Sequence, residues 1–277
     1  MFELFKPRNG DRPISEIVMN DGKVLVLPGG IKKEKQHTFS VLIGICTYKG
    51  IKETQMFNVC RALENCPDPK IKIVVWDGDA LIDRSRARLA TKFMTETDAD
   101  ILFFLDDDII SNTMDLTHMM WKMWQNDYDI LGGPYVIKSM KEKTFAIRLL
   151  EDKRDVQVGK DAPTIPIRYA STGCMGIRRR VFQKMIDKGT VHRCNPETMN
   201  FWPFFMPIEK NLNGKWVYLS EDWAFCERAL NLGFKVWCDF SVRLEHIGPY
   251  AYDWSNFFND IKKAPDNFVL PFDVKKE

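Results

Sequence analysis

The sequence predicts an α/β protein whose mostly parallel sheet is covered by helices on both faces. Two observations lead to this prediction. Apolar, β-branched runs alternate with segments of helical apolar spacing, and the connections between them are short. The run at 101–105 is apolar throughout, as expected for a strand buried inside such a sheet.

The alternation begins at residue 39. In chain order, the predicted strands lie at 39–46, 71–76, 101–105, 129–132, 168–171, 174–177, 234–238 and 242–245. The predicted helices lie at about 53–63, 83–96, 114–124, 178–188 and 220–232. A long polar stretch at 136–168 interrupts the rhythm, and we expect a mobile excursion of the kind that often binds substrate.

The chain of 277 residues is long enough for one large core. We expect three parts: a polar extension at 1–38 that carries a hairpin, a main domain at 39–250 and a tail at 251–277.

The overall charge excludes several classes of protein. With 40 Lys+Arg against 38 Asp+Glu, the chain lacks the excess of one sign found in histone-like proteins and acidic tails. Its apolar runs are too short for a membrane span, and the charged N-terminus lacks the apolar core of a secretory signal. The seven cysteines form no C-x-x-C pair, which excludes a zinc ribbon. We therefore expect a protein of the reducing cytoplasm, or of the host cytoplasm if the source is viral.

Three consecutive carboxylates follow the most apolar predicted strand. Asp106, Asp107 and Asp108 stand where open parallel sheets bind their ligands, at the carboxyl end of a strand. In an extended backbone Asp106 and Asp108 point to the same side, so they could share a divalent cation. Such a cation neutralises the charge that develops on a departing diphosphate. A solvated acidic turn is the alternative interpretation.

Two weaker motifs carry further candidate groups. Ser220 is a good N-cap residue, and Glu221 and Asp222 fall in the first turn of the predicted helix, where the dipole keeps a carboxylate ionised. One of them could take a proton from an attacking hydroxyl, although helix capping alone explains the pattern. His246 follows a predicted strand and could complete the metal site with Asp106 and Asp108, a ligand set that suits Mn²⁺ better than Mg²⁺.

Basic residues gather in one later segment. Between Arg168 and Arg193 there are seven basic residues and one acid, Asp187. A basic surface beside an acidic metal site would fit a substrate that carries phosphate, including nucleic acid.

Taken in order, these motifs resemble the nucleotide-sugar glycosyltransferases of the GT-A fold, in particular small family-two-like members from bacteria and phages. The resemblance covers about residues 40–250 and implies a Rossmann-like, mostly parallel sheet with a small antiparallel part. It implies a catalytic role for Asp222, with Glu221 beside it, and a metal site at Asp106, Asp108 and His246. The donor contacts that it implies are Thr47, Tyr48, Asp77, Arg86, Asp106, Asp107 and Gly133. The acceptor contacts that it implies are Tyr135, Gly173 and Trp223.

The sequence therefore predicts a hexosyl- or pentosyltransferase that uses Mn²⁺ or Mg²⁺ and a nucleoside diphosphate sugar, most simply a UDP-sugar. The acceptor hydroxyl is expected on a glycan, and a hydroxymethylated base in DNA is the alternative. A metal-dependent nucleotidyltransferase and a non-catalytic lectin-like module are two rival interpretations. The first lacks a Gly-rich phosphate loop here, and the second predicts a broken set of metal ligands.

Overall fold

The computed structural model describes residues 16–19, 24–26, 38–48, 59, 69–111, 113–139, 143–150, 153–212, 214–258 and 265–273. The predicted helix at 53–63 lies outside these residues, apart from the buried Val59.

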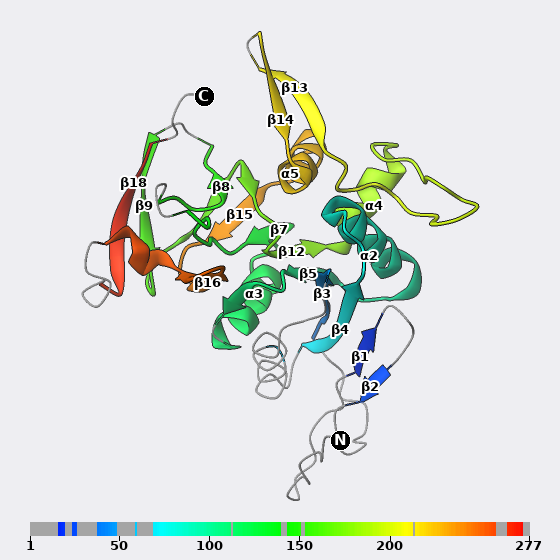
Figure 1. The fold of residues 1–277 in the computed structure, drawn as a ribbon, viewed down its shortest axis with the longest axis horizontal. Coiled ribbons are helices and arrows are strands. Elements are labelled where there is room, and N and C mark those ends of the chain that lie inside the picture. Colours follow the sequence, from blue (N-terminus) through cyan, green and yellow to red (C-terminus); the bar gives the residue numbers. More distant parts are fainter. Residues whose placement is uncertain are drawn as a thin grey trace, which may run out of the picture.

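A nine-stranded sheet forms the centre of the molecule (Figure 1). Its strands are, in spatial order, β10 (Thr164–Ile167), β15 (Val236–Asp239), β7 (Ile130–Gly132), β12 (Cys174–Arg178), β5 (Ile101–Leu105), β3 (Ser40–Thr47), β4 (Lys70–Asp77), β1 (Glu16–Met19) and β2 (Val24–Val26). The strands β1, β4, β3, β5, β7 and β15 run parallel, and β2, β12 and β10 run antiparallel to them. The predicted mostly parallel sheet is confirmed.

Helices cover both faces of this sheet. The helices α2 (Ile82–Glu96), α4 (Arg179–Asp187) and α5 (Glu221–Asn231) pack on one face, and α3 (Thr113–Gln125) packs on the other. Strand β5 feeds both cores, because Leu102 and Phe104 join the first while Ile101, Phe103 and Leu105 join the second. The alternation of side chains along one fully buried strand thus explains its unbroken apolar run.

The stretch at 136–168 differs from the expected irregular excursion. It contains β8 (Ile147–Arg148), β9 (Lys153–Gly159) and the edge strand β10. These strands pair with β11 (Tyr169–Ala170), β18 (Asn267–Asp273) and β15. The buried Val156 and Val158, two residues apart, show the strand period that the surrounding charges obscured in the sequence. Because β18 pairs along all of β9, the tail packs on this part of the main domain.

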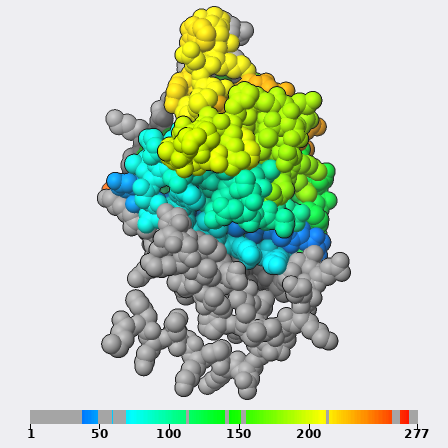
Figure 2. Space-filling view, turned by 90° about the vertical axis from the view of Figure 1, so that its right-hand side faces the viewer, coloured from blue at the N-terminus to red at the C-terminus, as the bar shows by residue number. Residues whose placement is uncertain are grey.

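Two small sheets complete the fold. Strand β16 (Leu244–Ile247) lies between β6 (Ile109–Ser111) and β17 (Ala251–Tyr252), and the short helix η1 (Trp254–Phe257) follows. The hairpin of β13 (Ile208–Leu212) and β14 (Lys215–Leu219) stands out from the body next to α5 and forms the yellow projection at the top of Figure 2. Within the described part of the chain, no helix has the length and apolar character needed to cross a bilayer.

Candidate active site

The parallel strands end together at one edge of the sheet, and the predicted donor residues lie there. Thr47 and Asp77 are paired in register at the ends of β3 and β4, and the acidic triplet follows the neighbouring β5. The Thr47 hydroxyl donates a hydrogen bond of 2.7 Å to Asp107 Oδ2. Next along the chain, Tyr48 leaves 60% of its surface exposed at this edge.

Arg86 connects the two acidic motifs. Its guanidinium is buried at the start of α2 and donates to both carboxylate oxygens of Asp106 at 2.7 Å. A second nitrogen of the same group donates to Glu221 at the start of α5. Residues 106 and 221, far apart in sequence, therefore meet through one buried cation, while the Nε of Arg86 has no hydrogen-bond partner among the described residues.

In this cluster the guanidinium and the two carboxylates each favour the ionised form of the other. Burial alone would lower the pKa of Arg86, but the carboxylates of Asp106 and Glu221 outweigh burial and raise it. Burial raises the pKa of Glu221, and Arg86 offsets part of that rise. Arg86 therefore remains charged and holds both carboxylates in place.

Asp222 lies beside this cluster in a different environment. Its Oδ1 accepts hydrogen bonds from the Ser220 hydroxyl at 2.5 Å and from the Trp223 backbone N–H at 2.8 Å. Ser220 is thus the N-cap residue of α5, but its hydroxyl binds Asp222 and not a free backbone N–H. Among the described residues, nothing donates a hydrogen bond to Asp222 Oδ2. Asp222 is partly exposed, so Oδ2 is a candidate proton acceptor.

Asp108 and His246 are brought together by strand pairing. His246 is opposite Ile109 in the β16–β6 ladder, and its Nε2 lies 3.7 Å from Asp108 Oδ2. The carbonyl of Val136 accepts a hydrogen bond of 2.9 Å from Nδ1, which fixes the ring with Nε2 on the side of Asp108. An imidazole nitrogen and a carboxylate that face each other across this gap suit a shared cation, and an Nδ1 held by a backbone carbonyl is typical of histidine ligands.

The third predicted metal ligand has another partner. Asp106 is engaged by Arg86, so within the described ranges no three His, Cys, Asp or Glu side chains are grouped as a metal site. Asp108 also pairs with Lys138, which no sequence motif marks because it lies in the polar stretch after Val136. Burial would raise the pKa of Asp108, but His246 and Lys138 together lower it to about 2.

Gly173 lies directly against the side chain of Tyr135. A Cβ atom at Gly173 would lie 2.6 Å from the Tyr135 hydroxyl oxygen, so only glycine fits there. The Gly173 carbonyl accepts a hydrogen bond from the Asp106 backbone N–H at 2.9 Å, which links this loop to the acidic triplet. The buried ring of Tyr135 stands edge-on to His246, with ring centroids 5.0 Å apart, and burial raises the pKa of its phenol.

The other two predicted contacts lie close to the core. Gly133 donates its backbone N–H to the Cys174 carbonyl at 2.9 Å, between β7 and β12. Trp223 stacks on Tyr169 with ring centroids 5.1 Å apart and leaves only part of its surface exposed.

Part of the predicted basic surface, the run Arg178 to Arg180, does not lie at this edge. In the β12–β5 ladder, Cys174 is opposite Leu105 near the acidic triplet, whereas Arg178 is opposite Ile101. Four residues of strand separate the two positions by about 13 Å. Arg178 and the arginines that follow it therefore lie toward the opposite edge of the sheet.

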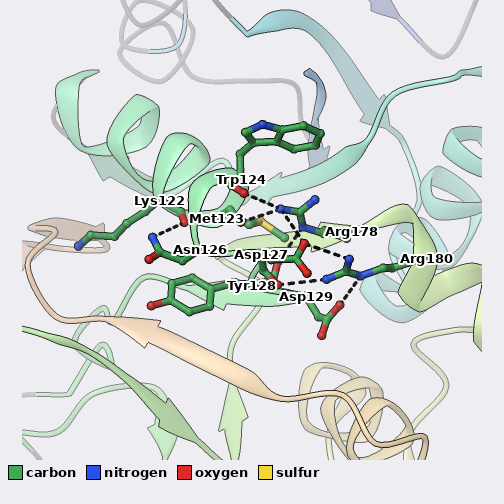
Figure 3. Close-up of polar contacts among 9 residues, drawn as sticks. All are labelled: Lys122, Met123, Trp124, Asn126, Asp127, Tyr128, Asp129, Arg178 and Arg180. Carbon is green, nitrogen blue, oxygen red and sulfur yellow. Dashed lines mark hydrogen bonds and ion pairs between the residues drawn. The ribbon is translucent and has the colours of Figure 1, made fainter. Parts of the chain in front are cut away.

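Those arginines are bound within the fold (Figure 3). Arg178 donates to the backbone carbonyls of Met123, Trp124 and Tyr128. Arg180 pairs with Asp127 and Asp129. The excess of positive charge in this segment thus includes side chains that fasten the end of α3 to β12 and α4.

Comparisons with known proteins bear on the fold and on the class of reaction. The model of glycosyl transferase family 2 matches residues 59–186, which confirms the resemblance over that part of the chain and supports glycosyl transfer. The crystal structure of A197 from STIV is similar to 76% of this chain and 86% of that chain, with a TM-score of 0.50 and 14% identity. At this identity the likeness shows the fold, and the predicted GT-A architecture is confirmed. No curated protein matches the chain.

Proposed function

We propose that this chain, whose residues 59–186 match glycosyl transferase family 2, transfers a sugar from a nucleoside diphosphate donor to an acceptor hydroxyl. One observation carries the proposal above all. Arg86 joins the acidic triplet to the Glu221-Asp222 motif, so a diphosphate-binding edge and a proton acceptor lie beside each other.

The donor would bind across the ends of β3, β4 and β5. The exposed ring of Tyr48 offers a stacking surface for the base, and Asp77 offers a carboxylate for a base N–H or a ribose hydroxyl. The guanidinium of Arg86 would supply positive charge beside the diphosphate. A uridine diphosphate sugar is the donor that we propose.

Asp108 and His246 would hold a divalent cation, for which Mn²⁺ is the best fit because one ligand is an imidazole and the other a carboxylate. When bound, this cation supplies positive charge to the departing diphosphate. Asp106 could complete the ligand set only by giving up part of its contact with Arg86.

Asp222 would act as the base. Oδ2 takes the proton of the acceptor hydroxyl, the hydroxyl oxygen forms a bond to the anomeric carbon, and the bond from that carbon to the diphosphate breaks. The Ser220 hydroxyl and the Trp223 N–H donate to Oδ1 and hold the carboxylate in position. Tyr135, Gly173 and Trp223 would border the acceptor.

A panel of nucleoside diphosphate sugars, tested by thermal shift with and without Mn²⁺, examines the proposal directly. We expect one UDP-sugar to raise the Tm only when Mn²⁺ is present, since a ligand that binds the folded state stabilises it. Nucleoside diphosphate should then be released only when an acceptor is supplied. If no nucleotide sugar shifts the Tm, or if nucleoside triphosphates are consumed with release of pyrophosphate, the proposal is wrong.

A further inference from the structure

The hairpin of β13 and β14 has two chemically different faces. Opposite residues of an antiparallel pair point to the same side, and the register places Glu209 opposite Tyr218 and Asn211 opposite Trp216. These four side chains form the outer face. The intervening residues, among them Ile208, Lys210, Val217 and Leu219, form the inner face.

The inner face fixes the hairpin to the body. Leu219 is buried, and Ile208 and Val217 pack against the core that lies under α5. Lys210 pairs with the buried Glu227 of α5, and Glu227 also accepts a hydrogen bond of 2.7 Å from the Tyr169 hydroxyl. The orientation of the hairpin is therefore set by contacts with the helix that begins at Glu221.

The outer face exposes two large aromatic rings. Trp216 leaves 69% of its surface exposed and Tyr218 leaves 70%. Both lie on β14, two residues apart, so their attachment points are separated by about 7 Å. Neighbouring exposed rings on a projecting element are unusual for a surface without a binding role.

We propose that this outer face, formed by Glu209, Asn211, Trp216 and Tyr218, binds sugar rings of an extended glycan acceptor. The inference rests on the proposed function and adds the class of acceptor. Sugar rings present C–H faces that lie flat on aromatic rings and hydroxyl edges that bond to carboxylates and amides. Strand β14 leads within three residues to Asp222, so a glycan that lies on the hairpin could extend to the proposed base.

The charge of the outer face indicates whether a glycan or a nucleic acid binds there. Single-stranded nucleic acids also stack on aromatic rings, but they bind to grooves lined with cations. The charged group on the outer face is the carboxylate of Glu209, and the lysines Lys210 and Lys215 belong to the other side of the hairpin. This face therefore suits a neutral polymer with many hydroxyl groups.

The test compares long and short acceptors in a double variant, Trp216→Ala with Tyr218→Ala. The probes are chitotetraose, cellotetraose, maltotetraose and mannotetraose, each beside its own monosaccharide, with the UDP-sugar that shifts the Tm as donor. We expect KM for the accepted tetrasaccharide to rise by about tenfold, because two stacked sugar units are lost. We expect KM for the monosaccharide and the Tm shift caused by the donor to stay unchanged. The variant Val269→Ala, at an exposed site on β18, is the matched control.

Several results would overturn the inference. One is an equal rise in KM for the tetrasaccharide and the monosaccharide, and another is no change in either KM. A third is that none of the tetrasaccharides binds or accepts sugar although the donor still shifts the Tm. Loss of single-stranded DNA binding in the double variant would assign the face to nucleic acid. A dimer that becomes a monomer in that variant would assign it to a second copy of the chain. Absence of any donor-induced Tm shift in the unaltered protein would instead contradict the proposed function itself.

Discussion

Arg86 is the residue on which the geometry of the candidate site depends most. It is 3% exposed and forms ion pairs with both Asp106 and Glu221, which are far apart in the sequence. A half-buried carboxylate left without its cation is costly, because water reaches it only in part. The pairing thus serves stability as well as the position of both acidic motifs.

Replacement of Arg86 by Met should lower the free energy of unfolding by about 2–3 kcal/mol, since two half-buried carboxylates would lose their partner and water would compensate only part of that loss. Urea unfolding followed by circular dichroism measures this change. Lys92→Met is the matched control on the same helix, because Lys92 forms a surface pair with Glu96 that contributes at most about 0.5 kcal/mol. Equal losses in the two variants would show that Arg86 is not the link described above.

Asp108 is the residue through which a cation should act. In Asp108→Ala we expect the affinity for the UDP-sugar to lose its dependence on Mn²⁺, because His246 alone is a poor site for a hard cation. The affinity for the UDP-sugar is measured by calorimetric titration, once in Mn²⁺ and once in chelator. Titration of the protein with Mn²⁺ alone adds a measurement that does not depend on turnover. Identical titrations of the unaltered protein in both conditions would contradict the assignment.

Some contacts of the candidate site have no local pattern in the sequence that would predict them. The acidic triplet and the Ser220-Glu221-Asp222 motif are visible as local patterns, so both were found. Lys138 gives no such pattern, because its partner Asp108 is 30 positions away and the strands that bring them together are short. The contact between Arg86 and Glu221 likewise depends on how α5 is placed against α2.

At the scale of elements, Glu227 is the point where the hairpin is fastened to α5. Burial would raise the pKa of Glu227, but Lys210 and the hydroxyl of Tyr169 outweigh burial and lower it. A carboxylate whose pKa is lowered by folding stabilises the native state above its unfolded pKa of about 4.3. That stabilisation is lost as the pH falls through the lower, folded value.

We therefore expect the unaltered protein to lose more stability between pH 5 and pH 3 (roughly the window around the unfolded pKa) than Glu227→Gln does. Glutamine keeps the size and can still accept the Tyr169 hydroxyl, but it carries no charge to titrate. Urea unfolding at both pH values measures the difference. If the two proteins show the same dependence on pH, the charge of Glu227 does not fasten the hairpin.

The elements most open to prediction were those with strong local patterns. Strand β5 matches its predicted bounds, and α2, α3 and α5 differ from theirs by one or two residues, because apolar spacing is read within a single helix or strand. The strands within 136–168 and the hairpin at 208–219 were missed. Their faces alternate between buried side chains and exposed charges or rings, so the apolar signal is diluted, and their pairing partners are distant in sequence.

At the scale of the whole molecule, the two edges of the sheet have different tasks. The carboxyl edge gathers the acidic motifs with Arg86, while the opposite edge gathers arginines that bind backbone carbonyls. Arg179 shows this role most clearly, since it donates to the carbonyls of Phe93, Thr97 and Ala99 at the end of α2. The near balance of charge along the chain therefore hides a separation in space.

Removal of the Arg179 guanidinium should affect stability and not substrate binding. Arg179→Met leaves several carbonyls at the end of α2 without a donor, and we expect a loss of about 3 kcal/mol in the free energy of unfolding. The affinity of the folded variant for the UDP-sugar should equal that of the unaltered protein. An electrophoretic mobility shift with duplex DNA at two salt concentrations provides the second readout, and strong binding that Arg179→Met abolishes would restore the basic segment as a nucleic acid surface.

In the proposed reaction, Asp222 takes the proton of the acceptor hydroxyl at an edge that has already bound the donor. The most direct measurement is the rate of sugar transfer by Asp222→Asn, taken together with its calorimetric affinity for the UDP-sugar in Mn²⁺. Asparagine keeps the size of the side chain but cannot take a proton, so we expect donor affinity to remain and transfer to fall by at least about 100-fold. Transfer at the normal rate by this variant would contradict the assignment of Asp222 as the base.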